Sequence, residues 1–186
     1  PILMGHALIG RLMIPIYRES PPAQSPANFA RLRRVRMALS GLMLTVMVPM
    51  TLGGVWLVDL LYDARYASSG AVVVMMAIAL LPQVLTLSYD QAALAAGDSR
   101  GYFWLNGTRA LLLVVLMLLA VPVAGVGGAA LAIGVTHLVC WPLGARLAHR
   151  HGAWDPMHDA LMGGLMVLLA LFAAVLHWPV ISATLG

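Results

Sequence analysis

Long runs of apolar residues, separated by short polar breaks, constrain the fold of this chain more than any other feature of its sequence. Hydrophobic residues make up 61% of the 186 residues and charged residues only 10%, whereas soluble domains carry about 25% charged residues. A soluble core does not require uninterrupted apolar runs of about 20 residues, but a lipid bilayer does. The sequence therefore predicts a stack of membrane spans.

Five apolar runs are long enough to cross about 30 Å of hydrocarbon, which takes about 20 helical residues. These runs are 37–61, 70–94, 102–123, 125–147 and 157–178. The stretch 1–16 is predicted to be part of a sixth span, and we expect the chain to be a fragment whose missing part lies upstream. Because backbone groups in lipid must pair internally, the spans are expected to be helices. The predicted fold is an all-α integral membrane protein, a single transmembrane domain over residues 1–186 formed by a helical bundle of about five complete transmembrane helices and one partial helix.

All eleven basic residues are Arg, and most of them gather in alternate breaks between spans. The Arg-rich breaks are 17–36, 97–101 and 146–159, which contain Arg18, Arg31, Arg33, Arg34, Arg36, Arg100, Arg146 and Arg150. On the other side, the break 63–69 contains only Arg65, and the break 124–125 contains none. The positive-inside rule therefore places the Arg-rich breaks in the cytoplasm. Since no aromatic-rich basic surface accompanies these residues, no nucleic-acid partner is expected.

The Ser, Pro and Gln residues of the cytoplasmic linker 17–36 predict an irregular segment. Asn28 is a candidate cap for a short helix that leads into the next span. The Arg cluster in the linker is interpreted as an orientation signal on a solvated face.

Motifs of catalytic chemistry are sparse, and we expect neither an enzyme nor a resident cofactor. The sequence shows no HExxH pattern, no nucleophile elbow and no Gly-rich phosphate loop after a strand. The group closest to a metal site consists of His149, His151, Asp155, His158 and Asp159. Because His149 and His151 are two residues apart, they would face different sides of a helix, and a polar loop near lipid head groups is expected instead of a metal site. Cys140, the only cysteine, is interpreted as a small buried apolar residue.

Ionisable residues inside the predicted spans are the better candidates for function, because burying a charge in lipid is costly. Four positions qualify: Arg11, Asp90, Arg109 and His137. If the helices around Asp90 and Arg109 pack antiparallel through their short connection, the two side chains form an ion pair that faces the bundle interior. The alternative is that both side chains extend independently to the membrane interface. His137 is a packing residue or a proton carrier.

Several patches in a consistent order resemble a known family. GRLMIPIYRE is similar to a helix end that leads into a cytoplasmic loop, and WLVDLLYDARYASSGAVVVMMAIALLPQVL is similar to a span end with the pattern LLYGxxY and an Ala-rich return into the membrane. AALAAGDSRGYFWLNGTRALLLVVLMLLAVPVAGVGGAALAIGV is similar to an ALGxxR turn, an NxxR helix start and a GxxGAAxA helix. Asp63 replaces the usual Gly, and Ala96 stands where Leu is common. From Gly10 to Trp178 the chain resembles the C-terminal lobe of bacterial polysaccharide flippases of the multidrug/oligosaccharidyl-lipid/polysaccharide exporter superfamily.

This resemblance implies two six-helix lobes around a central cavity, which rock by alternating access to move a lipid-linked oligosaccharide across the bacterial inner membrane. The implied partners are a polyprenyl diphosphate sugar, membrane lipids and the N-terminal lobe of the same chain. Arg109, with Arg11 as a second candidate, would contact the diphosphate, and Asp90 or His137 would couple transport to an ion.

Three other functions remain as alternatives. A multidrug or small-molecule antiporter and a lipid II flippase belong to the same superfamily. A membrane-embedded glycan polymerase or acyltransferase is a more distant alternative, which would need acid–base side chains or a sizeable periplasmic loop.

Overall fold

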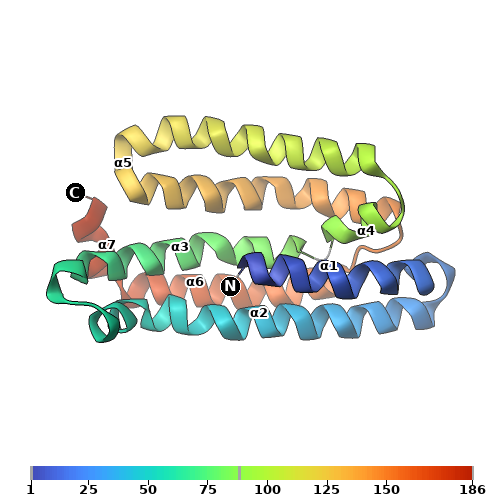
Figure 1. Cartoon of the computed structure of the whole chain (residues 1–186), viewed down its shortest axis with the longest axis horizontal. Helices are drawn as coiled ribbons and strands as arrows, with labels where there is room; N and C mark the ends of the chain where they lie inside the picture. Colours follow the sequence, from blue (N-terminus) through green and yellow to red (C-terminus); the bar gives the residue numbers. More distant parts are fainter. Residues whose placement is uncertain (1, 88, 186) are drawn as a thin grey trace.

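The computed structural model describes residues 2–87 and 89–185, and this part of the chain is all-helical (Figure 1). Pro1 and Ser88, which belong to two of the predicted spans, lie outside the described residues. The elements are α1 (Ile2–Glu19), η1 (Pro22–Gln24), α2 (Pro26–Leu61), η2 (Ala64–Tyr66), α3 (Ala67–Thr86), α4 (Tyr89–Ala95), α5 (Ser99–Arg150), α6 (Pro156–Leu176) and α7 (Trp178–Leu185).

Four helical segments in the described part are long and apolar enough to cross a membrane: 26–61, 68–95, 99–150 and 156–176. By length and hydropathy, the chain is therefore a multi-pass membrane protein.

Helix α5 is a hairpin rather than one long rod. A straight helix of 52 residues would extend to about 78 Å, far beyond the thickness of a bilayer. Ala124 and Gly125 leave helical geometry, and Gly125 has a φ of 51°, which glycine adopts at little cost. The first limb (residues 99–123) and the second limb (126–150) run antiparallel (Figure 1). The turn falls at the break 124–125 that the sequence predicted.

Helices approach each other closely where a glycine, which has no side chain, lies at the contact. A Cβ atom on Gly128 would overlap the backbone of Ala120, so the two limbs of α5 approach closely beside the turn. A Cβ atom on Gly70 would lie 2.8 Å from the Cα of Val55, which is a similar approach of α3 to α2. At Gly164, by contrast, no atom lies within 4 Å of the Cβ position, because this face of α6 is exposed.

Only residues 20–25 of the linker 17–36 lie outside the α-helices, so the irregular part is shorter than predicted, and the predicted lead-in helix is the first part of α2. Helix α1 continues to Glu19 and α2 begins at Pro26, so only a short connection around η1 separates them. The cap is Ser25, whose hydroxyl accepts a hydrogen bond from the Asn28 N–H at 3.1 Å, and not Asn28 itself. A serine followed by proline starts a helix well, because proline fixes φ at the first helical position, where its missing N–H is not needed.

The predicted span 70–94 contains most of α3, which ends at Thr86, and the seven-residue helix α4, which begins at Tyr89. Helix α4 places Tyr89 and Asp90 against polar partners on other helices, as described below.

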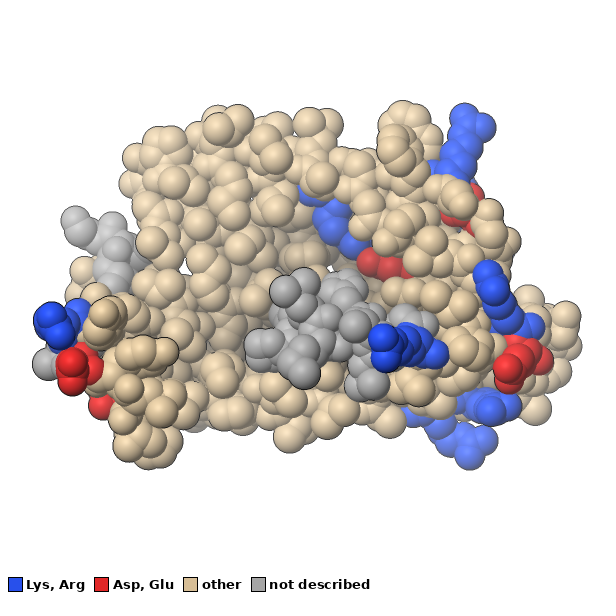
Figure 2. Space-filling model, in the orientation of Figure 1, with Lys and Arg blue, Asp and Glu red and all other residues tan. Residues whose placement is uncertain are grey.

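Charged side chains gather at the two ends of the bundle. Figure 2 shows most of the basic side chains at the end where α1 meets α2, and a smaller charged group at the opposite end. We call the end formed by the α1–α2, α4–α5 and α5–α6 connections the Arg-rich end. This distribution agrees with the alternation of Arg along the sequence.

Candidate functional site

Asp90 and Arg109 form an ion pair inside the bundle. Arg109 Nη1 donates to Asp90 Oδ2 at 2.8 Å, and Nη2 donates to Asp90 Oδ1 at 3.3 Å. The side chains are only 14% and 6% exposed, respectively. Of the two alternatives that the sequence left open, the structure therefore has the pair, and neither side chain extends independently to the interface.

Three local features bring the two residues together. Helix α4 ends in a turn at Gly97, whose φ of 75° reverses the chain direction. Asp98 then caps α5 by accepting a hydrogen bond from the Gly101 N–H at 2.8 Å. The first limb of α5 thus runs back beside α4, and the guanidinium group of Arg109 reaches the carboxylate of Asp90.

The ion pair does not satisfy every donor of Arg109. Asn106, three residues earlier in α5, accepts a weak hydrogen bond from Nη1 at 3.4 Å. Nε of Arg109 is buried and has no hydrogen-bond partner within residues 2–87 and 89–185. A guanidinium group has five N–H donors, so Arg109 retains capacity for another acceptor.

A second polar site, which sequence reasoning missed, centres on Arg36. This side chain is 1% exposed, although the whole Arg cluster was interpreted as an orientation signal on a solvated face. Its Nη2 donates to the hydroxyl of Tyr17 and to the carbonyl of Ala153, each at 2.8 Å. Its guanidinium carbon lies 4.6 Å from the centre of the Tyr89 ring, which is within cation–π range.

Asp155 connects this site to Arg33. Arg33 Nε and Nη2 donate to the two carboxylate oxygens of Asp155 at 2.6 and 2.9 Å, and Asp155 also caps α6 through the His158 N–H at 3.2 Å. Burial raises the pKa of Asp155, but the hydrogen bonds from Arg33 and His158, together with the nearby guanidinium charges, hold that pKa below its ordinary value. Asp155 is therefore a charged, buried anchor between α2 and α6.

Asp159 accepts hydrogen bonds from three aromatic side chains. The Tyr89 hydroxyl lies 2.5 Å from Oδ1, and the indole nitrogens of Trp141 and Trp154 donate to Oδ2 at 3.2 and 3.1 Å. His158 is 0% exposed and lies between Asp159 at 3.1 Å and the Ser40 hydroxyl at 2.9 Å. We call the whole set the polar cluster: Tyr17, Arg33, Arg36, Ser40, Tyr89, Trp141, Trp154, Asp155, His158 and Asp159.

The prediction that Asp155, His158 and Asp159 belong to a polar loop near head groups was wrong, because these residues are buried. One sequence signal was available. Asp155 directly precedes Pro156, and Asp–Pro at the start of an apolar run is a helix-start pattern that places the carboxylate against the end of the bundle.

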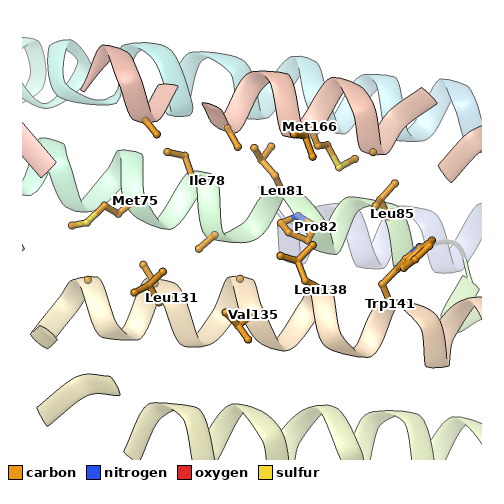
Figure 3. A pocket seen from close by; sticks show the side chains of 18 of the residues that line it. Met75, Ile78, Leu81, Pro82, Leu85, Leu131, Val135, Leu138, Trp141 and Met166 are labelled. Atoms are coloured by element: carbon orange, nitrogen blue, oxygen red, sulfur yellow. The ribbon is translucent and has the colours of Figure 1, made fainter. Parts of the chain in front are cut away.

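An apolar groove of about 600 Å³ leads away from the polar cluster. It lies between α3, the second limb of α5, α6 and α7, and Figure 3 shows Leu81, Leu138 and Met166 around it. Trp141 and Asp159 line both the groove and the polar cluster. The groove therefore offers an apolar volume with a single carboxylate.

The other predicted candidates lie on α1 and on the second limb of α5 or directly after it. Arg11 is exposed on α1, and His137 is half-buried on the second limb of α5, where Cys140 is fully buried. His149 packs edge-on against Trp154, and His151 contacts Asp98 at 3.2 Å. Within the described residues, no three His, Cys, Asp or Glu side chains come close enough together to hold a metal ion.

Comparison with known proteins gives no relative for this chain: no protein-family model, curated protein or solved structure matches it.

Proposed function

We propose that this chain forms one lobe of a transporter that moves a lipid-linked oligosaccharide across the bacterial inner membrane by alternating access. The observation that carries the proposal is the Asp90–Arg109 ion pair, buried within a multi-pass bundle. Ionisable residues inside the membrane are typical of substrate and ion sites in transporters. The resemblance to polysaccharide flippases supports the same function.

The chemistry of the cargo fits this pair. A polyprenyl diphosphate sugar is anionic at the head group, and phosphate oxygens accept paired hydrogen bonds from a guanidinium group. Without substrate, Asp90 neutralises Arg109 and stabilises the charge within the bundle. A diphosphate that reaches Arg109 would compete with Asp90 for the same N–H donors. Asp90, once released, would be available to a coupling ion, which is the role that the resemblance implies for it.

Arg11 and His137 have secondary roles in this proposal. Arg11 is exposed on α1, where a substrate head group could contact it on the way in. His137 is an alternative proton carrier on the second limb of α5. The second lobe implied by the resemblance would supply the remainder of the site.

The apolar groove favours one alternative, a small-molecule antiporter. Its volume of about 600 Å³ falls within the range of ligand pockets, about 300–1,000 Å³. An apolar cation would be compatible with the carboxylate of Asp159 at the end of the groove. A transport assay with both kinds of cargo separates the two functions.

The test uses the complete protein in proteoliposomes that carry a lipid-linked oligosaccharide on one leaflet. Transport is measured as the fraction of sugar that becomes accessible to a glycosidase on the other side. Arg109→Gln should reduce the rate about 100-fold, since it removes a charged hydrogen-bond donor worth about 3 kcal/mol. Arg65→Gln, at the opposite end and 85% exposed, is the matched control and should change the rate less than about two-fold.

The double variant Asp90→Arg/Arg109→Asp swaps the two charges and so keeps an ion pair. It should recover the transport that is lost in either single variant. No recovery would argue against a functional pair. Unchanged glycan transport in Arg109→Gln, or efflux of apolar cations without any glycan transport, would overturn the proposed function.

A further inference from the structure

A second groove, of about 550 Å³, lies between the two limbs of α5 at the Arg-rich end. We call it the basic groove, because three of its lining residues are Arg100, Arg146 and Arg150. The other residues that line it are Asp98, Gly101, Trp104, Leu105, Thr108, Leu143 and Leu147. The basic groove shares no residue with the Asp90–Arg109 pair, the polar cluster or the apolar groove.

The three guanidinium groups of the basic groove share a single carboxylate, that of Asp98, whose pKa the charge of Arg150 helps to lower. Within the described part of the chain, no carboxylate forms an ion pair with Arg100, Arg146 or Arg150. Asp98 is the one acidic residue in the lining, and it is already engaged by the Gly101 N–H and by His151. The hydrogen bond from Gly101 and the one from His151 hold the pKa of Asp98 below its ordinary value. The basic groove therefore has a positive charge that its own acid does not cancel.

The positions of the three arginines favour an anionic ligand. Arg146 and Arg150 are four residues apart, so they lie on the same face of the second limb, where two like charges repel each other. Arg100 approaches from the first turn of the first limb, whose backbone N–H groups add partial positive charge. An anion between the two limbs would relieve this repulsion and accept hydrogen bonds from both sides.

The surroundings of the basic groove indicate a lipid rather than a free anion. Trp104 is 62% exposed at its edge, and exposed Trp residues gather at the level of lipid head groups. Further along the first limb, Leu111 and Leu118 are 67% and 71% exposed, so an apolar surface continues from the basic groove. The first limb belongs to the least buried of the spanning segments. A phosphate next to such a surface matches a molecule that has both a head group and an acyl chain.

We propose that the basic groove binds the phosphate of an anionic phospholipid from the leaflet at the Arg-rich end. The guanidinium groups of Arg100, Arg146 and Arg150 hold the phosphate, Thr108 supplies a hydroxyl donor, and the acyl chains lie along the exposed first limb. This inference is independent of the proposed transport function, because it needs neither the ion pair nor a cargo.

The test measures lipid binding to the complete protein in detergent by native mass spectrometry. The probes are phosphatidylglycerol, which is anionic, and phosphatidylethanolamine of the same chain length, which has no net charge. The variant Arg100→Gln/Arg146→Gln/Arg150→Gln should bind phosphatidylglycerol about 100-fold more weakly, since each basic residue near an anionic surface contributes roughly a factor of five. Its affinity for phosphatidylethanolamine should not change.

A matched control removes three exposed arginines from the same end but outside the basic groove: Arg18→Gln/Arg31→Gln/Arg34→Gln. This variant should bind phosphatidylglycerol within about two-fold of the wild type, because a localised site does not depend on distant charges. Each triple variant keeps five of the eight arginines of the Arg-rich breaks, against Arg65 alone in the opposite breaks, so the orientation in the membrane is retained. If a triple variant does not fold, Arg146→Gln alone should weaken binding about five-fold.

If both triple variants lose the same affinity for phosphatidylglycerol, the attraction is general electrostatics and the proposed site is overturned. Unchanged phosphatidylglycerol affinity in the groove variant would also overturn it. Displacement of the bound lipid by an equal concentration of inorganic phosphate would show a site for free phosphate and contradict the lipid assignment. Retention of the lipid under millimolar inorganic phosphate would support it.

Discussion

Asp155 anchors α2 to α6, and replacing it should lower the unfolding free energy. Two contributions are lost, the ion pair with Arg33 and the cap of α6, and they can be measured separately. Its carboxylate is 0% exposed, receives two hydrogen bonds from Arg33 at 2.6 and 2.9 Å, and caps α6 through the N–H of His158. Asp155→Asn removes the charge but keeps a good N-cap, whereas Asp155→Ala removes both. The difference between the two variants isolates the capping contribution.

The magnitudes follow from the geometry. Loss of an N-cap costs about 1 kcal/mol of unfolding free energy. Hydrogen bonds to a charged group contribute about 1.5–3 kcal/mol, and we take the lower part of this range because solvent screens an Arg33 side chain that is 37% exposed. Asp155→Asn should therefore lower the unfolding free energy by about 2 kcal/mol, and Asp155→Ala by about 3 kcal/mol.

The assay is reversible unfolding of the purified protein in bicelles, with Arg33→Gln and the double variant Arg33→Gln/Asp155→Asn completing a thermodynamic cycle. The coupling energy should exceed about 1 kcal/mol if the ion pair acts as described. Two results would refute the assignment of Asp155 as a charged anchor. One is a loss of unfolding free energy below about 0.5 kcal/mol in Asp155→Asn, and the other is that the losses of the two single variants add up to that of the double variant.

Gly128→Ala should destabilise the α5 hairpin by about 1–3 kcal/mol in the same assay, because its Cβ would overlap the backbone of the first limb. Gly107→Ala, where nothing lies within 4 Å, is the control and should be neutral or stabilise by up to about 1 kcal/mol. Asp90→Asn should cost about 3 kcal/mol by leaving Arg109 buried without its partner, and adding Arg109→Gln should recover most of that loss; additive losses would contradict the pair. Because the folded-state pKa of Asp155 is depressed, its stabilisation should be complete above its ordinary value near 3.8 and disappear as the pH falls through the lower folded-state value. Acid titration of Asp155→Asn should show no such step.

The spans and their alternation could be predicted from the sequence because they depend on local properties. Apolar length sets which segments cross a membrane, and the break at Ala124–Gly125 has residues that tolerate a sharp turn. The pairing of Asp90 with Arg109 was one of two alternatives that the sequence left open, and it rested on the expectation that a short connection makes neighbouring helices antiparallel. Both inferences needed only the order of the residues along the chain.

The polar cluster could not be predicted in this way, because it depends on tertiary packing. Arg33, Arg34 and Arg36 have nearly the same neighbours in sequence, yet Arg34 is exposed and Arg36 is 1% exposed. Helical phase places Arg36 toward Tyr89 and Ala153, which are 53 and 117 residues away in sequence. The position of Ser25 ahead of Pro26 also decided that α2 begins earlier than Asn28 suggested.

Helix α4 joins the two polar sites within a single turn. Tyr89 contacts Arg36 and Asp159 of the polar cluster, and the next residue, Asp90, holds Arg109 on the first limb of α5. Helix α4 is only seven residues long, and it packs against both α1 and α5. Any movement of the α5 hairpin that carries Arg109 along must either break its bond to Asp90 or shift α4 and with it the ring of Tyr89. The interior charge on α5 and the buried Arg36 on α2 are thus mechanically linked through two adjacent side chains, and perturbing the Asp90–Arg109 pair should alter the environment of Arg36.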